Sequence, residues 1–255
     1  MLSAARRFYA KQGFDPGVCG LLLNPFYFAR KGLHRHIAAL AQEVRGSVLD
    51  VGCGTKPYRD LFSAERYVGL EIDSETARRS SGADFFYAGE HFPFPDAEFD
   101  TVLANQVLEH VFNPGTFLDE AWRVLKPGGR LLLTVPFVWD EHEQPHDFAR
   151  YSSFGLRHLV EAAGFLVLEQ HKSTRGIRAV FQIFEAYLYK SCIKGNPYLN
   201  ALTVLVLFAP VNLLGEFCGL VLPDNGDLYL DNVLLAQRPD EEKTGACADP
   251  GEIDR

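Results

Sequence analysis

The feature that most constrains the fold is a repeating order of short apolar runs and helical stretches. The first run, 47–51, ends at Gly52, and a helix-like stretch follows it. The same order recurs along the chain, with strand-like runs at 67–72, 83–87, 100–104, 130–135, 165–169 and 232–237. Strands that alternate with helices form parallel sheets covered on both faces. We therefore predict an α/β fold, doubly wound, with a mostly parallel sheet of seven strands.

The length of 255 residues fits one large domain with an appendage. We predict a helical lead-in over 1–45 and an α/β core over 46–176, whose final strand lies in 223–239. An apolar helical insertion, 177–222, precedes that strand. Residues 240–255 are polar and lack periodic apolar positions, so we expect a disordered tail.

Charge and cysteine content exclude some classes of protein. Lys and Arg number 25 against 33 Asp and Glu, and the formal net charge of −8 argues against nucleic acid as a partner. The five cysteines form no CxxC pair, which favours a reducing compartment. The N-terminal sequence lacks the apolar run of a secretory signal. We therefore expect a cytoplasmic protein, with the inner face of the membrane as a second location.

The insertion contains a nearly continuous apolar segment, 199–222. Its length suits a membrane-spanning helix, but Pro210, Asn212 and Glu216 interrupt it, and the amide and carboxylate would need partners in hydrocarbon. We expect two shorter helices, buried or at a membrane surface, and keep a spanning helix as the alternative. Four uses remain open: a lid over the substrate, a homodimer face, a peripheral membrane contact that reaches a lipid-linked substrate, or an extension of the core.

Two glycines and two acids stand where an open parallel sheet binds ligands, at the carboxyl ends of its strands. Gly52 and Gly54 allow close approach of the backbone to a ligand. Glu71 lies 19 residues after Gly52, near the offset at which a carboxylate binds ribose hydroxyls. Pro57 replaces the third glycine of the dinucleotide fingerprint, which argues against a nicotinamide oxidoreductase. A nucleoside with a cationic amino-acid tail fits better, and Asp50 either faces that tail or satisfies N–H groups of the loop.

Four sequence blocks together resemble the successive motifs of class I S-adenosylmethionine-dependent methyltransferases, over about 44–165. They are LDVGCGTKPY, YVGLEID, FPFPDAEFDTVLANQVLEHV and VLKPGGRLLLTVPF. A further stretch, WDEHEQPHDFARYSSFGL, resembles a loop of the bacterial members associated with cell-surface polysaccharide or other glycan pathways. The resemblance implies a Rossmann-like methyltransferase fold, S-adenosyl-L-methionine as cofactor, and O-methylation of a glycan or glycolipid precursor.

The resemblance also implies which residues hold the cofactor. The glycine-rich motif contacts the methionine moiety, the acid after the second strand binds the ribose, and a residue after the fourth strand lines the pocket. The cofactor-binding residues implied in this way are Asp50, Gly52, Cys53, Gly54, Glu71, Ile72, Asp73, Asn105 and His110. One position departs from the family pattern: Ala88 stands where an acid often holds the adenine amino group. Either backbone groups and Glu90 replace it, or the alignment is shifted by two residues.

Methyl transfer from a sulfonium is an in-line displacement, and a hydroxyl acceptor must lose its proton near the moment of attack. His142 and His146, in the loop after the fifth strand, are the candidate bases, with Asp147 beside them. The alternative is that both histidines only bond to neighbours such as Asp147 or Glu143. The loop is rich in metal ligands, but it lacks the spacing of a helical metal motif, and we predict no metal.

Two other functions remain open beside O-methylation of a glycan, whereas N-methylation is disfavoured. The N-methylation signature is absent after the fourth strand, which favours oxygen or carbon as the acceptor atom. The apolar insertion would equally suit a quinone-type or other lipid-ring methyltransferase. Ala88 leaves room for a methyltransferase fold that acts as a binding subunit without catalysis.

Overall fold

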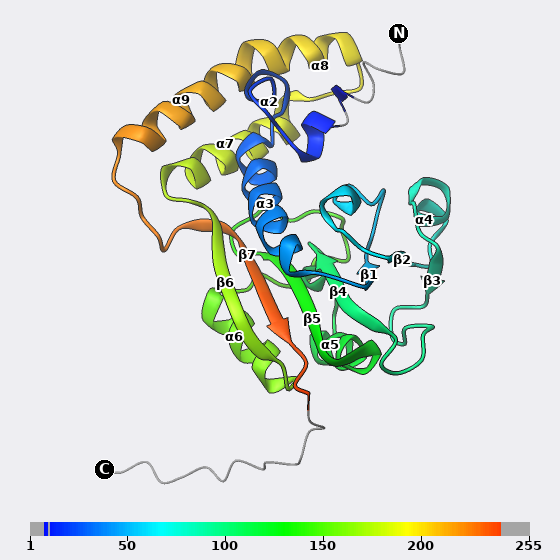
Figure 1. Cartoon of the computed structure of the whole chain (residues 1–255). Helices are drawn as coiled ribbons and strands as arrows, with labels where there is room; N and C mark the ends of the chain where they lie inside the picture. The colour runs from blue at the N-terminus through cyan, green and yellow to red at the C-terminus, as the bar shows by residue number, and fades with distance from the viewer. Residues whose placement is uncertain (1–7, 10, 241–255) are drawn as a thin grey trace, which may run out of the picture.

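The computed structural model describes residues 8–9 and 11–240, so most of the predicted tail lies outside the described residues. A seven-stranded sheet has the order β3-β2-β1-β4-β5-β7-β6 (Figure 1). Strand β7 runs antiparallel to both neighbours, and the other pairings are parallel. The strands are β1 (Ser47–Val51), β2 (Arg66–Ile72), β3 (Phe85–Tyr87), β4 (Phe99–Asn105), β5 (Leu125–Pro136), β6 (Leu166–Arg175) and β7 (Tyr229–Gln237). The predicted fold class is confirmed.

Each face of the sheet carries its own hydrophobic core, because neighbouring residues of a strand point to opposite faces. Helix α3 (Tyr27–Leu40) packs on one face, against Val48 among others. Helices α5 (Pro114–Val124) and α6 (Ser153–Ala162) pack on the other, where Leu49 is buried. In Figure 1, α3 lies in front of the sheet and α6 behind it. Burial on both sides explains why the strands read as continuous apolar runs.

The connections differ from the sequence prediction at two places. After β1 we expected a helix as far as residue 62, and the structure has only a 3-10 turn, η2 (Arg59–Leu61). After β4 the chain does not enter one unbroken helix, because the turn η3 (Leu108–His110) is separated from α5. Asn113 lies outside the helical conformation, with φ −113° and ψ 79°, because Pro114 follows it and a residue before proline disfavours that conformation. The short helix α4 (Glu75–Ser80) is capped by the Ser74 side chain, which accepts a hydrogen bond from the Ala77 amide.

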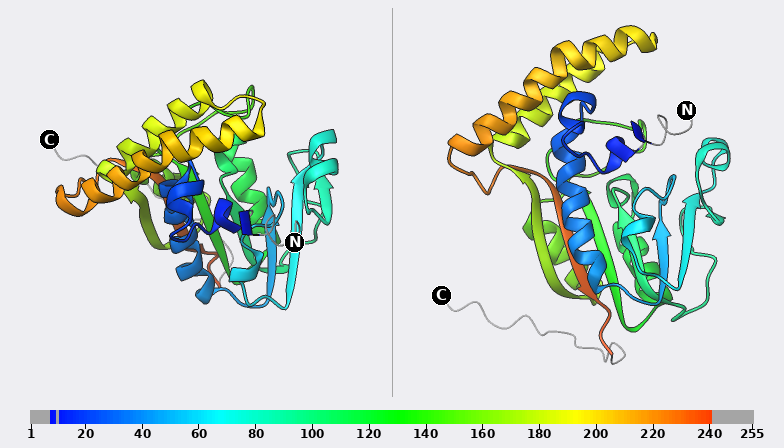
Figure 2. Two further views of the ribbon diagram at one scale, coloured as in Figure 1. Left: turned by 90° about the horizontal axis from the view of Figure 1, so that it is seen from above. Right: turned by 45° about the horizontal axis from the view of Figure 1, so that its top comes forward.

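The insertion was predicted to form two short helices in its apolar part, and this was wrong. After α7 (Ile177–Cys192), one continuous helix of 25 residues, Pro197–Val221, crosses the end of the molecule (Figure 2). It consists of α8 (Pro197–Thr203), a π-helical turn η4 (Val204–Phe208) and α9 (Ala209–Val221). Pro210 cannot donate the regular hydrogen bond to the preceding turn, and the wider π turn accommodates it without breaking the helix.

The polar groups of this long helix find partners within the protein. The Asn212 amide donates to the carbonyls of Leu21 and Asn24, which belong to or follow helix α2 (Gly20–Leu23). Glu216 pairs with Lys31 at 3.1 Å and with Arg178 at 2.8 Å. The helix is long and apolar enough to cross a membrane, but core helices of soluble proteins meet the same criterion of length and composition. Asn212 and Glu216, however, both face the protein here.

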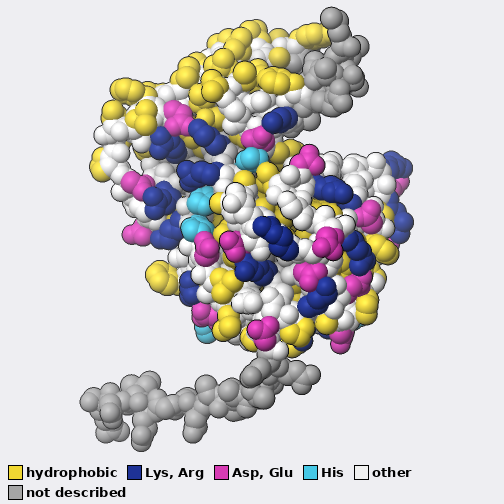
Figure 3. All heavy atoms as spheres, in the orientation of Figure 1, with side chains coloured by type: hydrophobic (Ala, Val, Ile, Leu, Met, Phe, Trp, Pro, Cys, Tyr) yellow, Lys and Arg dark blue, Asp and Glu magenta, His cyan; other side chains and the backbone are white. Residues whose placement is uncertain are grey.

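The opposite side of the insertion exposes apolar side chains, which we call the apolar face. Figure 3 shows them gathered over α8 and α9. The exposed members of α7, α8, η4 and α9 are Val180, Phe184, Tyr187, Tyr198, Leu199, Leu202, Leu205, Val206, Leu213, Leu214, Phe217, Leu220 and Val221.

Candidate active site

A cavity of about 450 Å³ lies at the carboxyl ends of β1 and β4. The glycine-rich loop forms its floor, and the lead-in, the β5–α6 loop and α7 form its walls. Of the predicted site residues, those that line it are Asp50, Gly52, Cys53, Gly54, Asn105, His110 and His142. The sheet topology thus brings together residues from three separate motifs, as expected for ligand sites in open α/β sheets.

The glycine loop is fixed by backbone bonds to the neighbouring strand. The amides of Gly52 and Cys53 donate to the Leu70 carbonyl, at 2.8 and 3.3 Å. Gly52 has φ +66°, and a Cβ there would lie 2.4 Å from the Val107 side chain, so glycine is required. Gly54 also has a positive φ, but the space beside it is open. The loop therefore presents bare backbone to the cavity, where a ligand can approach closely.

Glu71 supports this loop from the end of β2. Its carboxylate accepts a hydrogen bond from the Gly54 amide at 2.9 Å and another from the Ile72 amide at 3.1 Å. It does not itself line the cavity, but it lies directly behind the loop. Asp73, the second candidate, is bound by Arg78 through both carboxylate oxygens and is exposed. The geometry therefore favours Glu71 over Asp73 as the ribose-binding acid.

Asp50 is a buried carboxyl at the cavity wall, with only 4% of its surface exposed. The Tyr67 hydroxyl donates to its Oδ2 at 2.7 Å. Burial raises the pKa of Asp50 to about 7, against smaller opposing effects of Tyr67 and Lys56. A carboxyl that lacks a close cation in a partly dry site is suited to bind a ligand ammonium group.

Two more buried carboxyls lie at the same cavity: Asp231 lines it, and Glu109 lies behind His110. Asp231, on β7, has a pKa raised to about 7 by burial, and Glu109, in η3, has one raised to about 8. Within the described structure, no other residue donates a hydrogen bond to either oxygen of Glu109, or to Oδ2 of Asp231. Clustered, under-compensated carboxyls favour a positively charged ligand, and perturbed pKa values of this kind are typical of functional sites.

The β5–α6 loop holds His142 in place through a charged pair. Arg150 binds Asp147 through two nitrogens, at 2.5 and 2.7 Å. This pairing holds the pKa of Asp147 well below its usual range. Asp147 accepts a hydrogen bond from the His142 amide at 2.9 Å and lies 3.3 Å from its Nδ1. A carboxylate at Nδ1 fixes the ring and leaves Nε2 to accept a proton.

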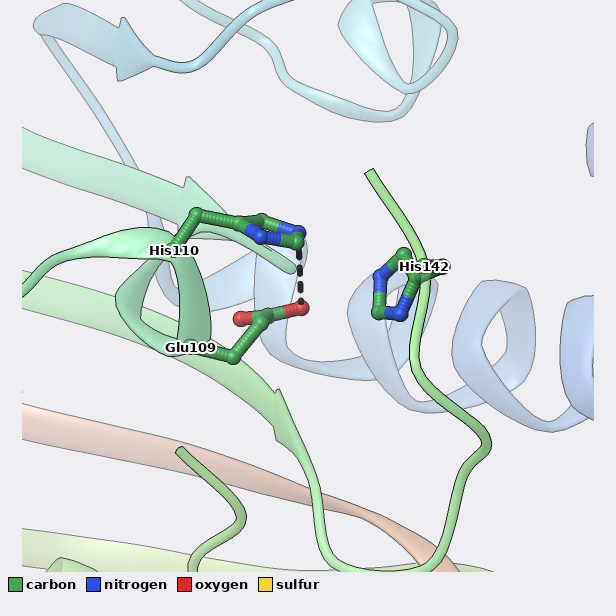
Figure 4. Close-up of side chains that lie close together, drawn as sticks. All are labelled: Glu109, His110 and His142. Carbon is green, nitrogen blue, oxygen red and sulfur yellow. Dashed lines mark ion pairs between the residues drawn. The ribbon is translucent and has the colours of Figure 1, made fainter. Parts of the chain in front are cut away.

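His110 and His142 meet Glu109 beneath the cavity (Figure 4). The two rings are 4.8 Å apart, and Nε2 of His110 lies 3.8 Å from the Glu109 carboxylate. Nδ1 of His110 is 2.6 Å from the His146 carbonyl, which can only accept, so this nitrogen carries the proton. The three ligand atoms lie within 4.8 Å of one another, and together they could hold a divalent ion. The sequence had predicted no metal.

Several predicted residues lie away from the cavity or serve only as part of its wall. The His146 side chain is exposed, and only its carbonyl takes part, through His110. Ile72 is largely exposed on the outer side of β2. Cys53 is buried, and burial raises the pKa of its thiol to about 12, so it is an inert wall residue. Ala88 directly follows β3, and the neighbouring Glu90 is exposed, so this position carries no acid turned to the cavity.

Sequence reasoning missed other parts of the site. Glu109 and Asp231 were not singled out, although an acid between apolar residues in LEHV was a usable signal. A lid was one of the four uses left open for the insertion, but no residue of the lead-in or of α7 was predicted for the site. They contribute Phe14, Phe26, Arg30, Tyr189 and Lys190. No local signal marks these residues, because only the tertiary fold brings them to the site.

The sequence is similar to known methyltransferases. A family described as "Methyltransferase domain" matches residues 49–133. An uncharacterized protein of Methanocaldococcus jannaschii is 30% identical, over 58% of this chain and 73% of the relative. A protein of Mycolicibacterium smegmatis named "Probable S-adenosylmethionine-dependent methyltransferase" is 33% identical, over 47% of this chain and 52% of its own length. The O-methyltransferase rstn1 of Aspergillus nomiae is 29% identical, over 60% and 80%.

Solved structures share the fold. A methyltransferase in complex with the Haloferax volcanii Trm112 methyltransferase activator has a TM-score of 0.51 and 19% identity, over 88% of this chain and 96% of that one. The phosphoethanolamine N-methyltransferase 2 of Haemonchus contortus, in complex with S-adenosyl-L-methionine, has a TM-score of 0.53 and 16% identity, over 87% and 56%.

Fold, motif order and sequence similarity agree, and the chain belongs to the class I S-adenosylmethionine-dependent methyltransferases. It is an enzyme, and S-adenosylmethionine is its cofactor.

Proposed function

We propose that this methyltransferase methylates a hydroxyl oxygen of a glycan or glycolipid precursor by direct in-line transfer. The observation that carries the proposal is His142, a cavity residue whose Nδ1 lies against the Asp147 carboxylate. Removal of a proton is needed when the acceptor is a hydroxyl, and a carboxylate-oriented imidazole is suited to that step. Two fungal relatives, rstn1 and cnsE, are named O-methyltransferases, which supports oxygen as the acceptor atom.

The residues of the cavity fit the cofactor. The open space beside Gly54 allows the backbone to approach the methionine moiety, and the carboxyl of Asp50 can bind its ammonium group. Glu71 can accept hydrogen bonds from the ribose. When bound, S-adenosylmethionine supplies an electrophilic methyl group on a cationic sulfur. The buried carboxyls of Asp50, Asp231 and Glu109 favour that positive charge.

The acceptor side of the cavity combines aromatic and polar groups. Phe26 lies 4.8 Å from Tyr189 and 6.1 Å from Trp139, ring centre to ring centre, so three aromatic rings form one wall. Asp140 and Lys190 of the same lining pair at 2.6 Å. A sugar ring offers an apolar face to such aromatics and hydroxyls to such charges. The resemblance of the β5–α6 loop to glycan-associated methyltransferases supports the same class of acceptor.

The chain's own residues divide the work of transfer. The aromatic wall and the charged pair orient the acceptor, which makes the reaction effectively unimolecular. His142 accepts the hydroxyl proton at Nε2, while Asp147 stabilises the charge that develops on its ring. Arg150 keeps Asp147 ionised for this task. The lid formed by the lead-in and α7 limits access of water to the reacting groups.

A panel of acceptors tests the proposal. The protein is incubated with methyl-labelled S-adenosylmethionine and free monosaccharides, nucleoside diphosphate sugars or polyprenyl-phosphate-linked sugars, with a catechol and a quinol as comparison acceptors. We expect label on a sugar oxygen, and a strong loss of it in His142→Gln. Transfer to the catechol or quinol alone would contradict the proposal and favour a lipid-ring methyltransferase. Cofactor binding without transfer to any acceptor would favour the binding subunit.

A further inference from the structure

The apolar face exposes large hydrophobic side chains along the whole length of the long helix. Tyr198 is 87% exposed and Leu220 is 79% exposed, at opposite ends of the 25-residue helix. The same helix turns Asn212 and Glu216 toward the protein, where both are bonded. In α9 these two polar side chains thus face inward while large apolar side chains face outward, which is the reverse of an ordinary surface helix.

A basic groove runs directly beneath α9, formed by two adjoining hollows of about 400 and 510 Å³. Helices α3, α6 and α7 and strand β6 supply its cations, and Figure 3 shows dark blue side chains below the apolar band. These cations are Lys31, Arg35, Arg157, Lys172, Arg175 and Arg178.

The carboxylates near the groove offset only part of this charge. Glu216 and Asp224 line the first hollow, where they pair with Lys31, Arg178 and Arg175. Asp227 and Glu161 pair with two other cations from outside the lining. The second hollow has no carboxylate among its described lining residues. The six cations therefore outnumber the four carboxylates paired with them, and the groove keeps an excess of positive charge.

Two histidines lie beside these cations. The rings of His36 and His171 are stacked with centres 5.2 Å apart, and Arg35 lies 3.2 Å from His36. Burial lowers the pKa of His36 to about 4, and the charges of Arg35, His171 and Arg175 contribute to the shift. His171 is itself paired with Glu169 at 2.8 Å. A bound anion would offset the positive charge around His36.

We propose that the apolar face and the basic groove together dock the protein on an anionic lipid bilayer surface. In this arrangement the long helix lies in the plane of the membrane interface, with its apolar face against the lipid acyl chains. The basic groove beneath α9 then binds phosphate headgroups. Apolar burial and attraction of cations to anionic lipid are the two parts of interfacial binding, and this surface carries both side by side. A second copy of the chain would cover the apolar face but would bring like charges together at the groove.

Docking would place a membrane-bound acceptor next to the active site. Helix α7 separates the two: Val180, Phe184 and Tyr187 belong to the apolar face, while Ala186 and Tyr189 line the cavity. This link to a lipid-linked acceptor rests on the proposed function, whereas the docking itself does not.

Vesicle co-sedimentation of the full chain tests the docking. We expect binding to vesicles of phosphatidylcholine with phosphatidylglycerol that weakens as salt is added, and little binding to phosphatidylcholine alone. The double variant Arg35→Gln, Arg175→Gln should lower vesicle binding on the order of tenfold or more, because each lost cation weakens binding about fivefold. Phe217→Ser with Leu220→Ser should lower it at least about tenfold. Calorimetric binding of S-adenosylmethionine to each variant shows that the protein is folded.

Matched controls carry the same chemical changes elsewhere. Arg79→Gln, on α4, removes an exposed arginine, and Phe154→Ser, on α6, removes an exposed phenylalanine. Both should bind vesicles like the unsubstituted protein.

Absence of binding to anionic vesicles at low salt would overturn the proposal. A dimer in light scattering that Phe217→Ser with Leu220→Ser converts to a monomer, without vesicle binding, would assign the apolar face to a second copy. Binding that persists at high salt and in both double variants would also overturn it. Methyl transfer is not needed for any of these readouts.

Discussion

The α/β core and the insertion both bury polar groups, but they treat them differently. In the core, Asp50, Glu109 and Asp231 are buried carboxyls that surround one cavity and lack full compensation. In the insertion, the Asn212 amide nitrogen donates to the lead-in and the Glu216 carboxylate pairs with two neighbouring cations, although Oδ1 of Asn212 has no hydrogen-bond partner in the described structure. The core thus keeps polar groups ready for a ligand, whereas the long helix uses them to fix its position and leaves its apolar side exposed.

One residue of the insertion breaks this rule. Glu185, on α7, is fully buried, and in the described structure neither carboxylate oxygen has a hydrogen-bond partner. Burial raises its pKa to about 9. It does not line the cavity, so its unpaired state has no direct use in binding the cofactor. The comparison teaches that a perturbed carboxyl indicates a site only when it lines a cavity or, like Glu109, contacts a polar side chain that lines one.

The largest expected effect concerns the base in the core. His142→Gln should lower kcat on the order of 100-fold, because the hydroxyl proton loses its acceptor. The Kd for S-adenosylmethionine should change less than twofold. Steady-state kinetics on the best acceptor of the panel measure this. His146→Gln is the matched control, since that side chain is exposed, and an equal loss in this variant would contradict the assignment of the base.

A second effect in the core concerns Asp50 and pH. Asp50→Asn should weaken cofactor binding about 10-fold or more, because an ammonium group loses a charged partner. In the unsubstituted protein the free carboxyl has a pKa of about 7, and only its ionised form binds the ammonium. Affinity should therefore fall as the pH drops below 7, and this dependence should be reduced in Asp50→Asn. Calorimetry from pH 6 to 8.5 measures both, and identical pH profiles would count against this role.

A third effect separates Glu185 from the carboxyls of the core. Its folded pKa of about 9 lies above the ordinary value of 4.5, so the folded protein holds an extra proton between these pH values. Its contribution to stability therefore decreases as the pH rises across this window. Glu185→Gln should remove that decrease and be more stable at pH 8, by roughly 1–3 kcal/mol. Urea unfolding at pH 6 and pH 8 measures how the free energy of unfolding changes with pH. An equal change for both proteins would refute the account of Glu185 as a buried charge.

The smallest effect concerns the attachment of the long helix. Asn212→Ala removes two hydrogen bonds and leaves the carbonyls of Leu21 and Asn24 without this donor. We expect a loss of about 1–2 kcal/mol in the free energy of unfolding, with unchanged cofactor affinity. Thermal unfolding and calorimetry measure the two quantities. A parallel loss of cofactor binding would show that core and insertion are not independent.

The sequence was most informative where structure is local. Apolar runs identified the strands, because burial on both faces demands such runs, and the glycine motif located the loop of Gly52 and Gly54. It failed where distant contacts decide. The continuity of the helix across Pro210 depends on a π turn and on packing against α2 and α7. The carboxyls of Glu109 and Asp231 become site residues only because β7 and the β5–α6 loop meet at the cavity.

The central claim is that the core holds S-adenosylmethionine through the glycine loop and Glu71, independently of the apolar face. Calorimetric titration of the unsubstituted protein, Glu71→Ala and Phe217→Ser with Leu220→Ser tests it directly. We predict binding by the unsubstituted protein, its loss in Glu71→Ala, and unchanged affinity in the variant of the apolar face. Absence of binding by the unsubstituted protein, or equal binding by Glu71→Ala, would contradict the account.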